Sequence, residues 1–176
     1  MKRHRDNRHH KLRDALIGSF LHWGINTEKE PYIQEGSGDR GDIEIAQPQG
    51  PVVLDVSVTC YSSVNTKNQQ KRIPSAATSV REREKTNRYE SSCTQQNKEF
   101  RPMVFQNLGG LGKKGLSFFQ DLKARPPSLR VNHSAQYVEG TRRKLVCLLM
   151  HSNVYMVLRW LHLVLPPDRG GVRGIE

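Results

Sequence analysis

Hydrophobic side chains recur at every third or fourth position near the start of the chain, between residues 8 and 23. This spacing places them on one side of a helix, and Gly24 is a typical residue at a helix end. We therefore expect a helix over residues 8–23, preceded by a basic disordered arm over residues 1–7. The hydrophobic stripe consists of Leu12, Leu16, Ile17, Phe20 and Leu21.

Three short runs that follow resemble β-strands, over residues 29–34, 41–47 and 52–59. Pro31 restricts the first run to an edge or an end of a sheet, because proline has no backbone N–H to donate. The sequence Pro-Gln-Gly-Pro at residues 48–51 separates the other two runs and is typical of a hairpin turn. We expect these two strands to pair as an antiparallel hairpin.

Helical and extended patterns alternate again in the next part of the chain. The patterns predict a charged helix over residues 74–93, a strand over residues 100–107 and a short helix over residues 114–123. Two glycines at residues 109–110 end the strand. The predicted order is αβββαβ followed by helices, an α/β (α+β) arrangement with a core over residues 8–124.

The last apolar stretch, residues 145–165, is long enough to raise the question of a membrane span. It contains Arg159, and a central arginine costs roughly 2.5–3.5 kcal/mol in a bilayer. We therefore expect a helix that packs on the domain or on a partner, and no membrane span. The predicted divisions after the core are a linker over residues 125–140, a helical segment over residues 141–167 and a disordered tail over residues 168–176.

Composition and charge narrow the possible partners. The 176 residues are enough for one compact domain, and 28 Lys and Arg against 17 Asp and Glu give a net charge of +11. This charge favours a polyanionic partner, and nucleic acid above a membrane surface. The three widely spaced cysteines exclude a disulfide framework and a paired-cysteine zinc site. No apolar signal-peptide segment follows the first residues, so we expect an intracellular, nuclear protein.

Acidic residues gather on one face of the predicted hairpin, because alternate residues of a strand point to opposite faces of a sheet. Asp42 and Glu44 share a face on the first strand, and Asp55 and Ser57 share a face on the second. A turn centred on residues 49–50 would set Asp42 opposite Ser57 and Glu44 opposite Asp55. The opposite face would then hold the aliphatic pairs Ile43–Val56 and Ile45–Leu54.

Facing carboxylates repel one another, so such a group needs a cation, a shared proton or good solvation. Asp42 and Asp55 would be diagonal neighbours with Cα atoms roughly 7–8 Å apart, within reach of one Mg²⁺ or Mn²⁺ ion. A bound divalent ion lowers the pKa of its water and offsets the charge that develops on a phosphodiester under attack. The alternative is a solvated and chemically inert polar face, and the pattern alone leaves both open.

The spacing of these two aspartates resembles the central motif of the PD-(D/E)XK nuclease superfamily. Residues 40–42 are Arg-Gly-Asp and, after twelve intervening residues, residues 55–58 are Asp-Val-Ser-Val. More narrowly, the chain resembles the restriction-enzyme-like endonuclease domain attached to reverse transcriptases of some non-LTR retrotransposons. Further landmarks between residues 8 and 123 follow the same order: Arg8-His9-His10, Glu30-Pro31, Lys85 with Tyr89, and Phe100-x-Pro102 with the glycine-rich residues 108–112.

The resemblance implies a mixed sheet flanked by helices and a Mg²⁺- or Mn²⁺-dependent endonuclease that cleaves DNA. Asp42 and Asp55 would hold the metal, and Glu30 would be a further acid of the catalytic group. The superfamily's usual lysine, two residues after the second acid, is Ser57 here. In several members that lysine lies on the following helix, so the resemblance assigns Lys85 to assist the attacking water. The alternative for Lys85 is one more solvated charge.

Two alternatives to an active nuclease remain at this point. The chain could have the same fold with a decayed site that binds nucleic acid without cutting it, as Ser57 suggests, or it could be a mobile-element remnant. The zinc knuckle that often accompanies the retrotransposon domain is missing from the sequence. Expected partners are DNA, including branched DNA or an RNA–DNA hybrid, a reverse-transcriptase domain in a longer parent protein, and a second copy of this chain.

Basic residues are expected to bind the phosphate backbone, which attracts them without regard to base sequence. The sequence shows no RNP signature, helix-turn-helix or two-histidine zinc finger, so we expect no base-reading module. The expected nucleic-acid-binding residues are Arg8, His9, Arg40, Arg81, Arg88, Lys113 and Lys114.

Overall fold

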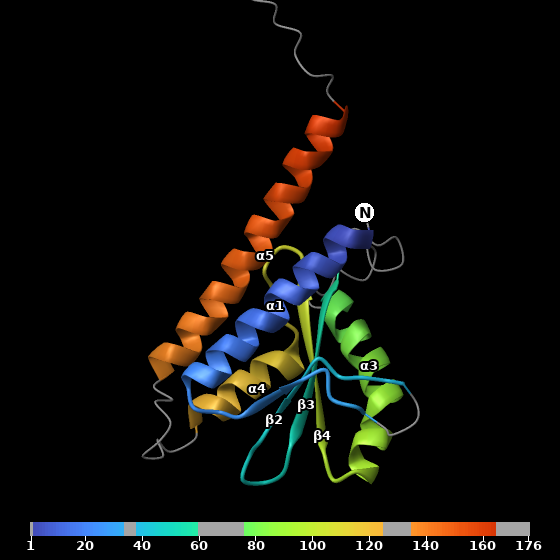
Figure 1. Cartoon of the computed structure of the whole chain (residues 1–176), viewed down its shortest axis with the longest axis vertical. Coiled ribbons are helices and arrows are strands. Elements are labelled where there is room, and N and C mark those ends of the chain that lie inside the picture. Colours follow the sequence, from blue (N-terminus) through green and yellow to red (C-terminus); the bar gives the residue numbers. More distant parts are fainter. Residues whose placement is uncertain (1, 34–37, 60–75, 125–134, 165–176) are drawn as a thin grey trace, which may run out of the picture.

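The computed structural model of the chain describes residues 2–33, 38–59, 76–124 and 135–164 (Figure 1). Its elements follow the predicted αβββαβ order and continue with two more helices. Four elements begin and end within two residues of the predicted bounds. They are the second strand of the hairpin and the helix, strand and helix that follow it. The elements are α1 (Lys2–His22), β1 (Thr27–Lys29), β2 (Ile43–Ile45), β3 (Val52–Thr59), α3 (Ala76–Gln95), β4 (Glu99–Gln106), α4 (Lys113–Ala124) and α5 (Ala135–Val164).

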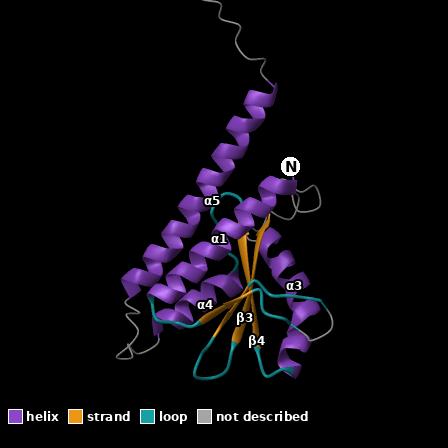
Figure 2. Cartoon of the chain, viewed as in Figure 1, coloured by secondary structure: helices purple, strands orange, loops and turns teal. Residues whose placement is uncertain are grey.

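The four strands form one mixed sheet in the order β1-β2-β3-β4 (Figure 2). The first three pair antiparallel, whereas β3 and β4 run parallel. Parallel neighbours need a crossover between them, which is usually a helix. Helix α3 makes that crossover and packs on β3 and β4.

Two hydrophobic clusters cover the two faces of the sheet. The larger cluster joins α1, α4 and α5 to one side of β3, including Phe20, Phe118 and Leu54. The smaller cluster lies under α3 on the other side. Strand alternation explains the division, because even-numbered residues of β3 belong to the larger cluster and Val53 to the smaller one. The smaller cluster consists of Ile33, Val53, Tyr89, Cys93 and Phe100.

Both α1 and α5 are longer than predicted. Helix α1 begins at Lys2, so the prediction of a disordered arm was wrong for residues 2–7. Adding residues to an existing helix is much easier than nucleating one, so a polar segment can continue it. Helix α5 begins at Ala135 and takes over part of the predicted linker, because Val138 and Leu145 continue its buried side among polar residues.

The first strand lies earlier than predicted. Strand β1 covers Thr27–Lys29 rather than residues 29–34. Glu30 adopts a left-handed backbone with a φ of 55°, which interrupts the regular strand. Pairing then continues only as an isolated bridge between Tyr32 and Arg40. The sequence predicted the strand too late because the hydrophobic residues Tyr32 and Ile33 follow Pro31.

The hairpin register differs by two residues from the prediction. Ile43 pairs with Leu54 rather than Val56, and Glu44 pairs with Val53 rather than Asp55. The turn is a four-residue one in which the Gly50 N–H donates to the Gln47 carbonyl at 3.1 Å, so its centre lies one residue earlier. A shift of two residues keeps every side chain on its predicted face, whereas a shift of one would reverse the faces.

No helix among the described residues combines the length and the apolarity that crossing a bilayer requires. The predicted loop over residues 61–73, the tail over residues 168–176 and residues 125–134 of the predicted linker lie outside the described residues.

Candidate active site

Asp55 lies on the α3 side of the sheet, where it contacts Lys85, and Asp42 lies beside β3 on the neighbouring segment. Asp42 directly precedes β2, and its N–H donates to the Leu54 carbonyl at 3.0 Å. Its Oδ2 accepts the Val56 backbone N–H at 2.6 Å. The Asp42 carboxylate is thus held against the two residues that flank Asp55, and its charge contributes to raising the Asp55 pKa. The structure brings the two predicted acids together.

His9 on α1 contacts the other oxygen of Asp42. The His9 Nε2 atom lies 2.9 Å from Asp42 Oδ1. The hydrogen bond to Asp42 raises the pKa of His9 above its usual 6.5, and partial burial opposes that rise. We predicted His9 as a nucleic-acid ligand, and the structure gives it a place beside the acid pair.

Asp55 is buried, and the ammonium group of Lys85 is its partner. The Lys85 Nζ donates to Asp55 Oδ1 at 3.0 Å and lies 2.8 Å from Oδ2 as an ion pair. Burial raises the pKa of Asp55, the Lys85 charge opposes the rise, and the Asp42 charge adds to it. Lys85 comes from α3 and also lies 5.5 Å from the Tyr89 ring centre.

Two polar atoms of this region are buried and accept no hydrogen bond from any residue that the structure describes. They are Asp55 Oδ2, whose contact with Lys85 lacks hydrogen-bond geometry, and the Ser57 hydroxyl. Buried polar atoms of this kind cost free energy unless a ligand or water satisfies them. The Lys85 charge compensates Asp55 Oδ2, which leaves the Ser57 hydroxyl as the atom of this pair that has no partner among the described residues.

The donor set fits a hard divalent cation. Mg²⁺ is usually held by one or two carboxylates and completes its shell with waters and substrate phosphate oxygens. Asp42 and Asp55 supply two carboxylates, and each oxygen can accept more than one partner. Among the described residues no three His, Cys, Asp or Glu side chains are grouped to hold an ion by themselves. Any ion here would consequently depend on water and substrate for the rest of its ligands.

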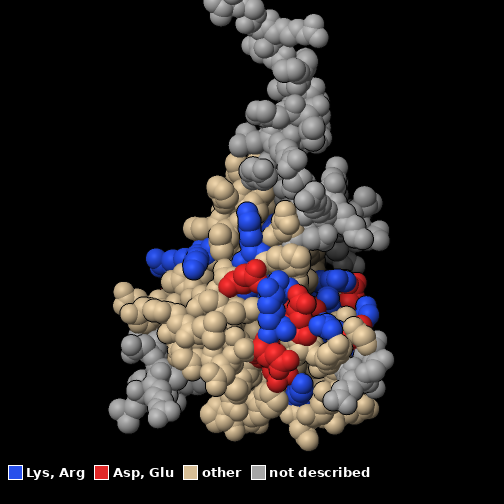
Figure 3. Space-filling view, in the orientation of Figure 1, with Lys and Arg blue, Asp and Glu red and all other residues tan. Residues whose placement is uncertain are grey.

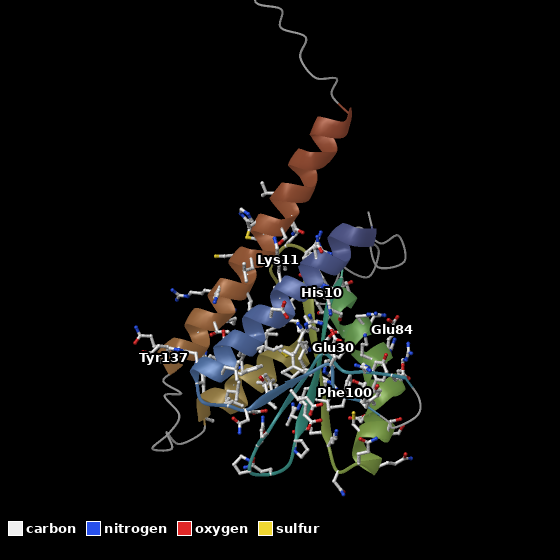
Figure 4. The ribbon with its side chains drawn as sticks, viewed as in Figure 1. His10, Lys11, Glu30, Glu84, Phe100 and Tyr137 are labelled. Carbon is white, nitrogen blue, oxygen red and sulfur yellow. The ribbon has the colours of Figure 1, made fainter. Side chains whose placement is uncertain are left out.

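Glu30 is not part of the acid pair, although we predicted it as a third catalytic acid. Its carboxylate accepts a hydrogen bond from Arg13 on α1 and is about half exposed (Figure 4). Arg13 is 4% exposed and also binds Asp14. Arg13 falls beside the buried stripe of Leu12 and Leu16, and a charge at such a position needs an anionic partner. That position indicates that Arg13 needs an anionic partner, and the structure identifies Glu30 as that partner.

The other predicted nucleic-acid ligands are spread over several elements. Figure 3 shows Lys and Arg interleaved with Asp and Glu on the face in view, between α1 and α3. Lys113 and Lys114 begin α4 and line a groove of about 460 Å³ with Arg101, but the two aspartates do not line it. The partners of the rest are Asn153 for Arg8, Tyr32 for Arg40, Glu84 for Arg81 and Asp39 for Arg88.

Sequence reasoning missed Glu82, a buried carboxylate on α3. Its Oε1 accepts the Lys114 backbone N–H at 2.9 Å at the start of α4, where N–H groups have no helical partner. A Cβ at Gly112 would come 2.2 Å from this oxygen, so the glycine lets the carboxylate reach the helix end. Glu82 thereby connects α3 to α4. Nothing in the sequence distinguished it from the other glutamates of its charged helix.

No protein-family model matches the sequence, and no curated protein matches it either.

Proposed function

We propose that this chain is a divalent-metal-dependent endonuclease domain of the PD-(D/E)XK type, which cleaves DNA phosphodiester bonds and derives from a retrotransposon. The observation that carries the proposal is the group of Asp42, Asp55 and Lys85. Two carboxylates from neighbouring strands and one ammonium from the following helix meet there. The αβββαβ order with a mixed sheet agrees with the proposed fold.

Each residue of the group has a chemical role in this proposal. Asp42 and Asp55 would hold the ion, which when bound lowers the pKa of its water and offsets charge on the phosphate. Lys85 would orient the attacking water and stabilise the charge that develops on the phosphate oxygens. His9 and the Val56 N–H hold Asp42 in position, because each binds one of its oxygens.

The test is a nicking assay on plasmid DNA with Mg²⁺ or Mn²⁺. We expect the wild-type chain to nick DNA and Asp55→Ala to lose at least about 100-fold in rate, since it removes one of the two anions that hold the ion. Asp121→Ala is the matched control, because Asp121 is half exposed and its ion-pair partner, Arg101, lies at 3.6 Å. Equal rates for wild type and Asp55→Ala, or no nicking with either metal, would contradict the catalytic proposal.

A second candidate is the same fold retained for binding only. Ser57 stands where the superfamily's usual lysine would be, and the Lys85 ammonium already neutralises Asp55. Calorimetry separates the two candidates. A binding module would bind DNA and show no Mn²⁺ uptake that depends on Asp42, whereas a nuclease would lose its Mn²⁺ uptake in Asp42→Ala. A reverse-transcriptase domain and a second copy of the chain remain proposed partners.

A further inference from the structure

An exposed pair of flat side chains lies near the two acids. Tyr32 and Arg40 stand opposite each other in the isolated antiparallel bridge that continues the β1–β2 pairing. The Arg40 guanidinium carbon is 4.2 Å from the centre of the Tyr32 ring, and Arg40 Nη2 donates to the Tyr32 hydroxyl at 2.5 Å. Tyr32 is 49% exposed, so the stacked pair lies at the surface.

Backbone hydrogen bonds hold this pair in place before any ligand arrives. The Gly41 N–H donates to the Pro31 carbonyl at 2.9 Å, and the Ile33 N–H donates to the Asp39 carbonyl at 3.0 Å. These bonds lie on either side of the Tyr32–Arg40 bridge. A surface that is ordered in advance loses less conformational entropy when it binds.

The chain directly connects the pair to the proposed active site, because only Gly41 separates Arg40 from Asp42. Gly41, between them, is buried, and a Cβ there would come 2.4 Å from Val53 Cγ1. Consecutive Cα atoms are about 3.8 Å apart, so the Cα atom of Arg40 lies within about 8 Å of that of Asp42, the acid that would hold the ion.

Burial does not account for the position of Tyr32. Tyr89, by contrast, is 7% exposed and packs against Phe100 in the smaller core. Nucleobases stack on aromatic rings and on guanidinium planes. Inside a duplex both faces of a base are already covered by its neighbours, so only an unpaired base can use such a surface. Arg88, which binds Asp39 at 2.9 Å, adds a second cation beside the bridge for a phosphate.

We propose that Tyr32 and Arg40 form a stacking site for an unpaired nucleobase, which makes DNA with a single-stranded segment the preferred substrate. The cleavage part of this inference rests on the proposed function, and the binding part rests only on the geometry of the pair. The two parts can therefore be tested separately.

The test is a binding titration with the full chain in the presence of a chelator, so that no cleavage occurs. The probes are a labelled oligothymidylate of about 12 nucleotides and a blunt duplex. We expect Tyr32→Ala to weaken oligothymidylate binding about tenfold and duplex binding less than about twofold, because one stacked base is lost. Tyr32→Phe keeps the ring and should bind like the wild type.

Two further variants sharpen the test. Tyr137→Ala removes a similarly exposed tyrosine from α5 and should change neither affinity. Arg40→Lys keeps the charge but loses the flat guanidinium, so it should weaken oligothymidylate binding while the salt dependence stays the same. Equal losses for both probes in Tyr32→Ala, or equal effects of Tyr32→Ala and Tyr137→Ala, would overturn the stacking site. If the chain nicks no DNA yet shows the Tyr32 effect, only the nuclease proposal fails.

Discussion

Two carboxylates of similar burial, Asp55 on β3 and Glu82 on α3, have different surroundings. Asp55 is 6% and Glu82 is 5% exposed, and burial raises the pKa of both. Backbone N–H groups at the start of α4 satisfy Glu82. Asp55 has a lysine and a second acid as neighbours, and its Oδ2 accepts no hydrogen bond from a described residue. Glu82 thus connects two helices, whereas Asp55 is the carboxylate to which the proposed function assigns a metal ion.

Among the variants that test the difference between Asp55 and Glu82, the largest expected effect is on the rate of DNA nicking. Lys85→Met removes the ammonium beside Asp55, so we expect nicking to fall about 100-fold and the pKa of Asp55 to rise further because its neutralising charge is gone. Nicking rates and an NMR titration of the Asp55 carboxyl measure the two effects.

The matched control is Lys98→Met. The Lys98–Glu44 pair, at 2.7 Å, lies on the same face of the sheet and is about as buried as the Lys85–Asp55 pair. Its loss should leave nicking unchanged. A similar loss of nicking in both variants would mean that Lys85 acts only through stability.

The next largest expected effect is on the free energy of unfolding when Glu82 is replaced. Glu82→Ala leaves the first N–H groups of α4 without their acceptor, so we expect the free energy of unfolding to fall by about 2 kcal/mol. Urea denaturation measures it. Glu84→Ala is the control, because Glu84 is exposed and pairs with Arg81 on the same helix, and its effect should stay within about 0.5 kcal/mol. Equal losses in the two variants would contradict the capping role of Glu82.

We expect a smaller loss in the free energy of unfolding when the Glu82 carboxylate is displaced than when it is removed. Gly112→Ala would push a methyl group against its carboxylate, at a cost of about 1–2 kcal/mol. Gly18→Ala is the control with the opposite sign, because nothing lies within 4 Å of a Cβ at Gly18 and alanine favours a helix. Thermal unfolding compares them. A Gly112→Ala variant as stable as the wild type would show that the carboxylate can move without loss.

The most subtle prediction concerns the pH dependence of stability. The raised pKa of Asp55 means that the folded state binds a proton more readily than the unfolded state, whose carboxyl has a pKa near 3.8. Stability from this group is therefore present at low pH and falls as the pH rises through the folded pKa. Asp55→Asn lacks that loss, so we expect the stability of Asp55→Asn relative to the wild type to increase as the pH rises from about 3.8 to neutral.

Urea denaturation in metal-free buffer at several pH values measures the free energy of unfolding of Asp55→Asn and of the wild type. The free energy of unfolding of the variant minus that of the wild type should decrease as the pH falls towards 3.8. A difference that is the same at every pH, or one that decreases as the pH rises, would contradict a raised pKa of Asp55.

The faces of the hairpin could be predicted from sequence because a strand alternates with a period of two. That period survived an error of two residues in the register, so the residues of β2 and β3 keep their predicted faces, whereas Asp42 lies just outside β2 and contacts His9 on α1. The helices and later strands were predictable for the same reason, since their hydrophobic spacing is local. The pairing of Glu30 with Arg13 could not be predicted, because Arg13 comes from another element.

By itself, the sequence determined the order of the elements and which strand residues share a face. Only the tertiary structure decided that Lys85 contacts Asp55, that His9 contacts Asp42, that Glu82 caps α4 and that Tyr32 stacks on Arg40. Hydrophobic periodicity acts between residues near one another in the chain. The partners of buried charges depend on which distant elements the packed core brings together, and no local pattern encodes that.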